Sequence, residues 1–346
     1  MRPYSFALLL WGLFLPAHFF AQAQIGTESI FRTLQKYEPL NITIETDLKQ
    51  LKSEKTDETW QPAIFQVLQG DSAVLRFNVQ VAARGNMRKK TCDFPPIKIK
   101  FYADETVNDS IADVNELKLV TSCHKTEQNE EWVRKELVVY QLYNLLTEQS
   151  FRVKQANVKI TSPDKKSSPV ESFAFFIENE KELAARLGGK PIKPKIVSLK
   201  IMDTTAYDRA CLFQYMIGNT DWSIRVRHNV KVIYFSGRNK AAPIPYDFDY
   251  CGLVGTNYAA PSPEIPIQTV KERYFMGPCR SAAHYQQVFD LFLSKKQAML
   301  DHIEQSDFLA KDSKKQMDNY LDEFFQVIEK PATAKREIIQ NCNKSN

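Results

Sequence analysis

Residues 218–252 contain the side chains of this sequence that are best suited to carry chemistry. They form two polar groups, each next to an apolar segment: first Asp221, His228 and Asn229, then Asp247 and Asp249. Carboxylate and amide oxygens suit Mg²⁺, and a further carboxylate can orient a hydroxyl that attacks a phosphoryl group. The set is therefore the one needed to hold a divalent cation on a triphosphate. Capping of turns is the simpler alternative, because Asp and Asn commonly do this.

The elements predicted around these residues would bring them together. Residues 207–218 are mostly apolar, as expected for a helix buried on several sides, and residues 229–235 and 243–246 have the composition of short strands. Asn229 then begins one strand, while Asp247 directly follows the other. We expect the acidic and amide groups to arrive at the same ends of neighbouring strands.

The rest of the chain divides into a strand-rich half and a helical half. Alternation of apolar and polar residues predicts strands with one buried face at 42–46, 73–83, 97–101, 116–120, 153–160 and 172–177. Residues 131–146 are helical in character, and residues 283–330 predict two or three amphipathic helices. This order indicates an α+β protein with two lobes: a β-rich lobe over 24–190 and a mainly helical lobe over 191–346.

The composition is that of an ordinary globular protein. The 346 residues are 43% hydrophobic and 25% charged, which excludes a long disordered or collagen-like chain. A formal net charge of +5 is too small for this length to indicate nucleic acid as a partner. With 11 glycines, the chain is not expected to use a glycine-rich phosphate-binding loop.

Residues 1–23 predict a secretory signal peptide. Residues 6–15 are an apolar run that Pro16 ends, and the segment Ala21-Gln22-Ala23 is a small-x-small cleavage pattern. The run is too short for a membrane span, and no other stretch reaches the ~18 apolar residues that a membrane helix needs. We therefore expect an exported, soluble protein of the periplasm or the extracellular space that does not span a membrane.

The cysteines agree with export, which makes disulfides possible. Six cysteines occur in the sequence, and the expected pairs are Cys92–Cys123 and Cys251–Cys279. Cys211 lies in an apolar helical stretch, so a buried free thiol is expected there. No C-x-x-C motif is present, and a structural zinc site is therefore not expected.

Several of these motifs occur in an order that resembles a known family. They are Arg84-Gly85-Asn86 with a basic stretch, IKIKF, GNTDW followed by His-Asn, and PYDFDYCG. From about Ala82 to Gly252 the chain resembles the spore-coat CotH family of secretory, atypical protein-kinase-like proteins. The resemblance implies a two-lobed kinase-like fold, here with a helical C-terminal extension. It also implies transfer of phosphate from ATP, with Mg²⁺ or Mn²⁺, to Ser or Thr of exported proteins.

The resemblance assigns roles to the polar residues of 218–252. Asp221 corresponds to the catalytic-loop Asp that orients the acceptor hydroxyl, and Asn229 corresponds to the metal-binding Asn of that loop. Asp247 or Asp249 corresponds to the Asp that holds the metal on the phosphates. Asp247 is favoured because it directly follows the apolar strand.

Such a site also needs a cation from the N-terminal half of the chain. Lys118 lies on the last strand before helix 131–146 and is the candidate for contacting the α- and β-phosphates. Glu136, on that helix, is the candidate partner of this lysine. Lys98 and Lys100 are alternatives to Lys118.

The segment between strands 73–83 and 97–101 lies where a loop could cover the phosphates. Arg84 and Lys90 would supply charge there in place of glycine backbone. A basic, solvated hairpin is the simpler alternative for this segment.

Three hypotheses of function remain open. The first is an exported kinase that acts on a protein acceptor with a bound nucleotide. The second is a catalytically inactive kinase-like module that binds a component of the cell envelope. The third is an unrelated secreted enzyme or glycan binder, which a dispersed arrangement of Asp221, Asn229 and Asp247 would favour.

Overall fold

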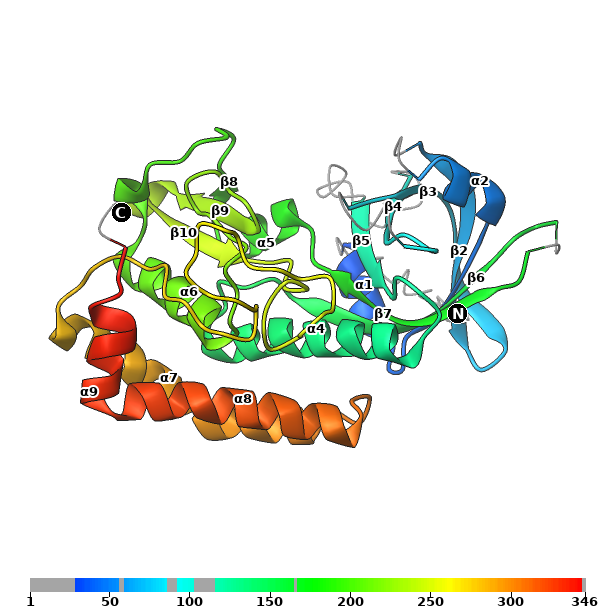
Figure 1. Cartoon of the computed structure of the whole chain (residues 1–346). Helices are drawn as coiled ribbons and strands as arrows, with labels where there is room; N and C mark the ends of the chain where they lie inside the picture. Colours follow the sequence, from blue (N-terminus) through cyan, green and yellow to red (C-terminus); the bar gives the residue numbers. More distant parts are fainter. Residues whose placement is uncertain (1–28, 56–58, 86–91, 103–115, 165–166, 344–346) are drawn as a thin grey trace, which may run out of the picture.

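The computed structural model describes residues 29–55, 59–85, 92–102, 116–164 and 167–343. Lys90 and the predicted signal peptide lie outside these ranges. A β-barrel forms one end of the molecule, and helices with a small sheet form the other, as Figure 1 shows. The long helix α4 (Glu127–Leu146) runs between them.

Seven strands form a closed barrel in the order β1-β2-β3-β4-β5-β7-β6. Their bounds are β1 Asn41–Thr46, β2 Gln61–Gln69, β3 Ser72–Ala83, β4 Ile97–Phe101, β5 Glu116–Thr121, β6 Val153–Thr161 and β7 Val170–Ile177. Neighbouring strands are antiparallel except β1 and β6, whose parallel pairing over Asn41–Glu45 closes the barrel. Closure leaves no free sheet edge between these two strands.

The barrel interior is an apolar core of its own. Alternate residues of each strand point inward, and four phenylalanines meet there: Phe65, Phe77, Phe101 and Phe176. The short helices α1 (Ile30–Gln35) and α2 (Leu48–Ser53) add their buried side chains to the same core. The barrel therefore has a core of its own, while the outer faces of β5 and β7 also pack on the core of the helical end.

Helices dominate the other end of the molecule. They are α5 (Glu180–Arg186), η2 (Leu199–Ile201), α6 (Thr204–Met216), η3 (Ser236–Arg238), α7 (Ala282–Glu304), α8 (Lys311–Glu329), α9 (Pro331–Ala334) and the π-helical turn η4 (Lys335–Ile339). In Figure 1, α7 and α8 lie side by side beneath α4. A small sheet of β8 (Lys190–Pro191), β9 (Val230–Phe235) and β10 (Lys240–Pro245) packs on α6.

The barrel contradicts the fold expected from the sequence. A two-lobed, atypical kinase-like fold with a helical C-terminal extension was predicted, and a closed seven-stranded barrel of mixed strands with attached helices is found. The alternating patterns identified most strands but not their partners, and β2 was not predicted. The parallel contact between β1 and β6, which closes the barrel, joins segments far apart in the chain.

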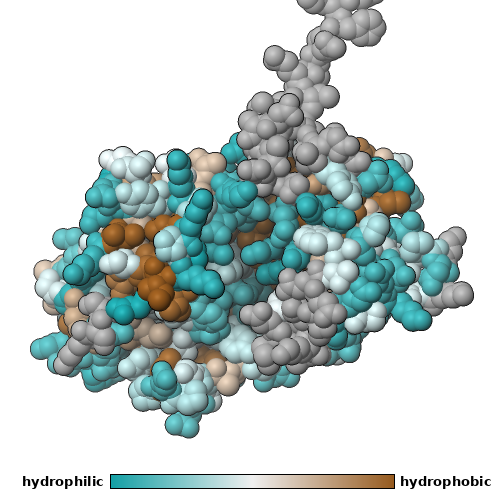
Figure 2. Space-filling model, turned by 90° about the horizontal axis from the view of Figure 1, so that it is seen from above, coloured by the Kyte–Doolittle hydropathy of each residue, from teal (hydrophilic) through white to brown (hydrophobic). Residues whose placement is uncertain are grey.

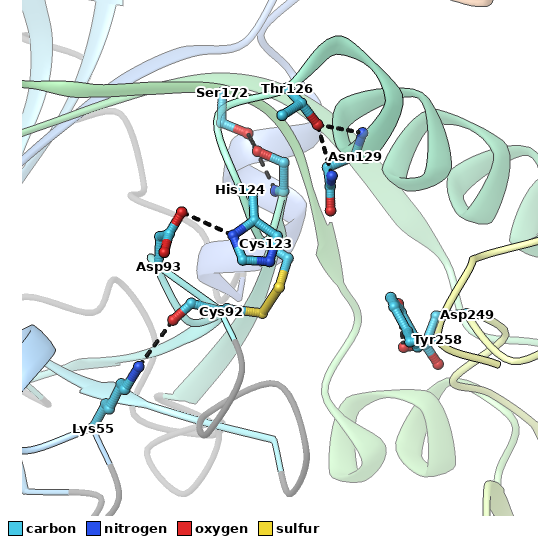
Figure 3. Close-up of a disulfide and its surroundings, with 11 residues drawn as sticks. Lys55, Cys92, Asp93, Cys123, His124, Thr126, Asn129, Ser172, Asp249 and Tyr258 are labelled. Atoms are coloured by element: carbon cyan, nitrogen blue, oxygen red, sulfur yellow. Dashed lines mark hydrogen bonds and ion pairs between the residues drawn. A yellow bond between two sulfur atoms is a disulfide. The ribbon is translucent and has the colours of Figure 1, made fainter.

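Two disulfides link parts of the chain. Cys92 pairs with Cys123, as predicted, and ties the segment before β4 to the segment after β5. Figure 3 shows this bridge beside the hydrogen bond between His124 and Asp93. The predicted pair Cys251–Cys279 is wrong, because Cys279 pairs with Cys342 and Cys251 is a buried free thiol.

Cys211 is a buried free thiol, as predicted, and burial raises its pKa. Across the described parts of the chain, no helix is long and apolar enough to cross a bilayer.

Candidate functional site

The loop that carries Asp221 begins at a sharp turn after α6. Gly218 has a φ of 64°, and a Cβ added there would lie 2.0 Å from the Tyr320 hydroxyl oxygen. Only glycine accepts both the left-handed backbone and this close approach. The next residue, Asn219, is buried, and its side-chain oxygen accepts a 2.9 Å hydrogen bond from the backbone N–H of Asp221. The start of the loop is thereby fixed.

The two ends of this loop meet through their side chains. Asn229 Nδ2 donates to Asp221 Oδ2 at 2.9 Å and to the Asp221 backbone carbonyl at 2.8 Å. His228 Nε2 lies 2.8 Å from Asp221 Oδ1. The backbones of Ser223 and His228 are bridged in both directions, so the loop is a closed unit. The structure therefore brings together Asp221 and Asn229, as the sequence predicted.

Asp247 joins this pair because β9 and β10 are neighbours. Pro245 pairs with Val230, and just beyond them the Tyr246 N–H donates to the Asn229 carbonyl at 3.1 Å. Asp247 follows with a φ of 64°, a backbone conformation that Asp tolerates better than most residues. Its own N–H donates to the Tyr140 hydroxyl at 2.8 Å. Asn229 and Asp247 thus leave neighbouring strands at the same end.

Asp247 and Asp249 lie in different surroundings. No described residue donates a hydrogen bond to the Asp247 carboxylate, which is only partly buried. Asp249 is buried, and its Oδ2 accepts a 2.9 Å hydrogen bond from the Tyr258 hydroxyl. Figure 3 shows these two residues side by side. The carboxylate of Asp247 is therefore the more available of the two for a metal ion.

Lys118, on β5, approaches the segment of Asp247 from the barrel side, through the ring of the preceding residue, Tyr246. Its ammonium nitrogen lies 5.3 Å from the centre of the Tyr246 ring. Burial lowers the pKa of Lys118 to about 8, and repulsion from Arg84 and Lys231 contributes to this, while attraction to Asp247 opposes the shift. The charges of Arg84, Lys118 and Asp247 therefore act on one another, although they come from distant parts of the chain.

Arg84 directly follows β3 and is fixed by its backbone. Its N–H donates to the Pro96 carbonyl at 2.8 Å, which ties the end of β3 to the start of β4. Its charge acts on Tyr140 and Tyr246 as well as on Lys118. Lys90, its predicted companion, lies outside the described residues.

A cleft of about 220 Å³ opens beside Lys118. Its walls combine charged groups with apolar ones, and its lining includes Lys118, Phe151, Ile177, Glu180, Lys231 and Tyr246. Lys231 forms a 3.1 Å ion pair with Glu180 across this region, and its ammonium lies 5.2 Å from the centre of the Tyr246 ring. The Tyr246 ring is thus contacted by two ammonium groups, one of them from the barrel.

The predicted partner of Lys118 lies elsewhere. Glu136 is buried on α4 and lines a small cavity with Asp249 and Trp132. Among the ion pairs of the described residues there is none between Lys118 and Glu136, and the acidic groups that act on Lys118 are Asp247 and Glu180. The carboxylate of Glu136 instead raises the pKa of Tyr140, an effect that adds to the larger one from burial of that hydroxyl.

The alternative lysines are less well placed than Lys118. Lys98 lies opposite Lys118 on β4, but its ammonium lies over the Trp60 ring, 4.8 Å from the centre. Lys100 is exposed. Of the lysines considered from the sequence, Lys118 is therefore the one that lines the cleft.

The oxygen donors present fit Mg²⁺ or Mn²⁺ delivered with a nucleotide. Within the described ranges, no three His, Cys, Asp or Glu side chains form a site that could hold a metal by themselves. Mg²⁺ usually needs only one or two protein carboxylates, because water and substrate phosphates supply the remaining ligands. The Asp247 carboxylate and the Asn229 side-chain oxygen both lack a hydrogen-bond donor among the described residues, so they could take this part.

Sequence reasoning missed three residues of this region. Asn219 holds the Asp221 backbone, Tyr140 holds the Asp247 backbone, and Tyr246 contacts Lys118. Tyr140 could have been found, because it lies one helical turn after Glu136 on α4 and so shares its face. Asn219 stands out only as an amide directly after a helix-ending glycine.

Comparison with known proteins identifies no relative of this chain among protein families or curated proteins. No protein-family model matches the chain, and no curated protein is significantly similar to it. The resemblance to the CotH family therefore remains a prediction from motifs, and the function must be argued from the residues themselves.

Proposed function

We propose that this protein transfers a phosphoryl group from Mg-ATP to a Ser or Thr hydroxyl of an exported protein. The observation that supports this best is that the charges of Arg84 and Asp247 both act on Lys118, which lines the cleft. The barrel contributes Arg84 and Lys118, while the segments around β9 and β10 contribute Asn229 and Asp247. Attraction between Lys118 and Asp247 joins these separate parts of the fold, and a metal-bound triphosphate needs both signs of charge.

Each residue has a role that follows from its contacts. Lys118 and Arg84 would neutralise phosphate oxygens, and the Tyr246 ring and Phe151 would contact the base in the adjoining cleft. Asp247 and Asn229 would hold the divalent ion, which offsets the charge that develops on the transferred group. These roles need no glycine-rich loop.

Asp221 is the proposed acceptor of the proton from the attacking hydroxyl. Asn229 and His228 hold its two oxygens in one orientation. An ionised carboxylate has about four lone-pair positions, so both oxygens can still accept a further hydrogen bond. Its orientation is thus set before the acceptor hydroxyl arrives, which is what a positioned base needs.

Transfer assays on Asp221→Ala test the proposal directly. Loss of a positioned base lowers the transfer rate by about 10²–10⁴-fold, whereas Mg-ATP affinity changes little because Asp221 contacts the acceptor. ADP formation and phosphate incorporation into a Ser-containing acceptor are the measurements.

Ser223→Ala, in the same loop, is the matched control. The Ser223 hydroxyl oxygen accepts a long 3.5 Å hydrogen bond from the Val226 N–H and has no proposed part in the transfer. This variant should therefore transfer phosphate at the rate of the wild type. Full activity of Asp221→Ala would contradict the proposed role of the carboxylate.

A second candidate function is favoured by the contacts that the Asp221 carboxylate already makes. Both carboxylate oxygens already have partners, as in a structural turn. A module that binds nucleotide or an envelope component without catalysis would have the same contacts. Nucleotide binding by the wild type with no transfer to any acceptor would favour this alternative.

A further inference from the structure

An apolar groove lies outside the candidate site, at β8 and the chain that follows it. It has a volume of about 470 Å³, and apolar side chains dominate its lining: Pro191, Ile192, Pro194, Ile196, Val197 and Tyr234. Ile196 is 71% exposed, an unusual state for an isoleucine. Figure 2 shows apolar residues gathered on this upper face toward the left, with hydrophilic residues around them. Exposed apolar surface with a polar border commonly marks an interaction site.

The backbone of the groove is unsuited to strand addition. Pro191 and Pro194 have no N–H to donate, and the Ile192 N–H already donates to the Val232 carbonyl at 2.9 Å. Prolines at a sheet edge prevent a further strand from pairing. An occupant would therefore bind through its side chains, with apolar groups entering the groove.

Lysines and arginines lie beside the groove. Lys190 and Lys193 line it, and Lys195 lies between Pro194 and Ile196 in the chain. Arg225 and Arg227 are hydrogen-bonded to its backbone. Positive charge thus lies beside an apolar groove. Complementary binding then requires an acidic partner.

The groove is joined to the loop that carries Asp221. Arg227 has a φ of 54° and donates hydrogen bonds to the carbonyls of Ile192 and Lys193 at 2.6 Å and 3.3 Å. The Val197 N–H donates to the Arg225 carbonyl at 2.8 Å. Arg225 and Arg227 both lie between Asp221 and Asn229 in the chain. A protein bound in the groove would therefore be held next to the proposed acceptor site.

We propose that the groove docks the acceptor protein through a segment in which apolar side chains are flanked by Asp or Glu. The apolar groups enter the space beside Ile196, and the acidic groups face the surrounding lysines and arginines. This inference rests on the proposed function, since the docked protein is the phosphate acceptor. It adds a substrate class: proteins with an acidic, apolar segment near the Ser or Thr that is modified.

The test uses a fluorescein-labelled peptide with two leucines among Asp and Glu residues and one Ser nearby. Fluorescence anisotropy with the full chain should show binding that weakens as salt is raised, because surface charge is screened. Ile196→Asp should lower the affinity by about tenfold or more. Val74→Asp is the matched control, since Val74 is an exposed valine on β3, and its affinity should equal that of the wild type. Equal binding by Ile196→Asp would overturn the inference.

Two peptide controls separate charge from apolar contact. Replacing both leucines by Ser should abolish binding at any salt concentration, and replacing the acidic residues by Lys should abolish it at low salt. Binding of anionic phospholipid vesicles but not of the acidic peptide would overturn the inference in favour of a membrane surface. Self-association that Ile196→Asp removes, without peptide binding, would overturn it in favour of a second copy of the chain.

A transfer assay distinguishes failure of this inference from failure of the proposed function. With the acidic peptide as acceptor, Ile196→Asp should raise KM about tenfold and leave Mg-ATP affinity unchanged. Equal KM in the wild type and Ile196→Asp would overturn docking and leave phosphoryl transfer standing. Peptide binding that depends on Ile196, with no transfer by the wild type, would overturn the proposed function and support the groove as a binding site.

Discussion

The barrel-facing and helix-facing sides of the segment Asp247-Phe248-Asp249 differ sharply. On one side, the Asp247 carboxylate attracts the charge of Lys118 and accepts no hydrogen bond from the described residues. On the other, Asp249 is buried and accepts a hydrogen bond from Tyr258. Two identical side chains, two positions apart, thus belong to regions with different physical roles.

Phe248 accounts for the separation. It is fully buried, and its ring lies 4.7 Å from that of Tyr140 and 5.7 Å from that of Phe213. With this ring fixed in the core, the residues before and after it have distinct surroundings. The left-handed backbone of Asp247 and its hydrogen bond to Tyr140 add to the constraint. Packing, rather than residue type, decides which acid is available to a ligand.

The largest expected effect comes from removing the ring that separates the two regions. Phe248→Ala deletes a fully buried ring and leaves a cavity, which should lower the free energy of unfolding by about 3–5 kcal/mol. Urea unfolding measures this. The exposed Val74→Ala is the control and should change it by less than about 0.5 kcal/mol. A loss below about 1 kcal/mol for Phe248→Ala would show that the ring does not fix the segment.

A smaller effect on stability is expected for Asp249→Ala. It leaves the Tyr258 hydroxyl without this acceptor and should lower the free energy of unfolding by about 1–3 kcal/mol. Tyr258→Phe removes the same hydrogen bond from its other end and should cost a similar or smaller amount. Thermal unfolding of both variants provides the measurement. If Asp249→Ala were as stable as the wild type, the Asp249 carboxylate would have no structural role, which would contradict the contrast with Asp247.

A third effect is the pH dependence of stability that comes from Lys118. Burial lowers its pKa to about 8 from the ordinary 10.5, so the folded chain loses this proton at a lower pH than the unfolded chain does. Between these values the unfolded chain binds more protons, and the contribution of Lys118 to stability therefore rises with pH. From pH 8 to 10.5, the unfolding free energy of the wild type should increase relative to Lys118→Met.

The exposed Lys100 supplies the control for this prediction. Wild type and Lys100→Met should share one pH profile over the same range. A parallel profile for Lys118→Met would mean that the environment of Lys118 does not shift its proton affinity.

The sequence predicted single strands better than the strand pairing that closes the barrel. Alternation located β3 and β4 to within a residue, because one buried face of a strand leaves a period-two pattern. Nothing in that pattern encodes the parallel pairing of β1 with β6, which depends on the whole barrel. The kinase-like fold was inferred from the order of motifs, and motif order does not specify which strands pair.

The candidate site was predictable where residues are close in sequence or at strand ends. Asp221 and Asn229 share a loop, and Asp247 follows the strand beside it, so their proximity follows from one strand pair. The proposed pairing of Lys118 with Glu136 is not found among the described residues, because the face of a helix against a barrel depends on tertiary packing. The partner of Cys279 was missed for the same reason, since α7 and α8 lie between Cys279 and Cys342 in the chain and their packing is tertiary.

We propose that Asp247, and not Asp249, binds the metal ion of a nucleotide. Titration calorimetry of ATP with Mg²⁺ on the wild type, Asp247→Ala and Asp249→Asn tests it most directly. We expect Mg²⁺-dependent binding by the wild type and by Asp249→Asn. Asp247→Ala should lose at least about tenfold in affinity, with its free energy of unfolding unchanged. Equal affinity of the wild type and Asp247→Ala, or no binding by any of the three, would contradict it.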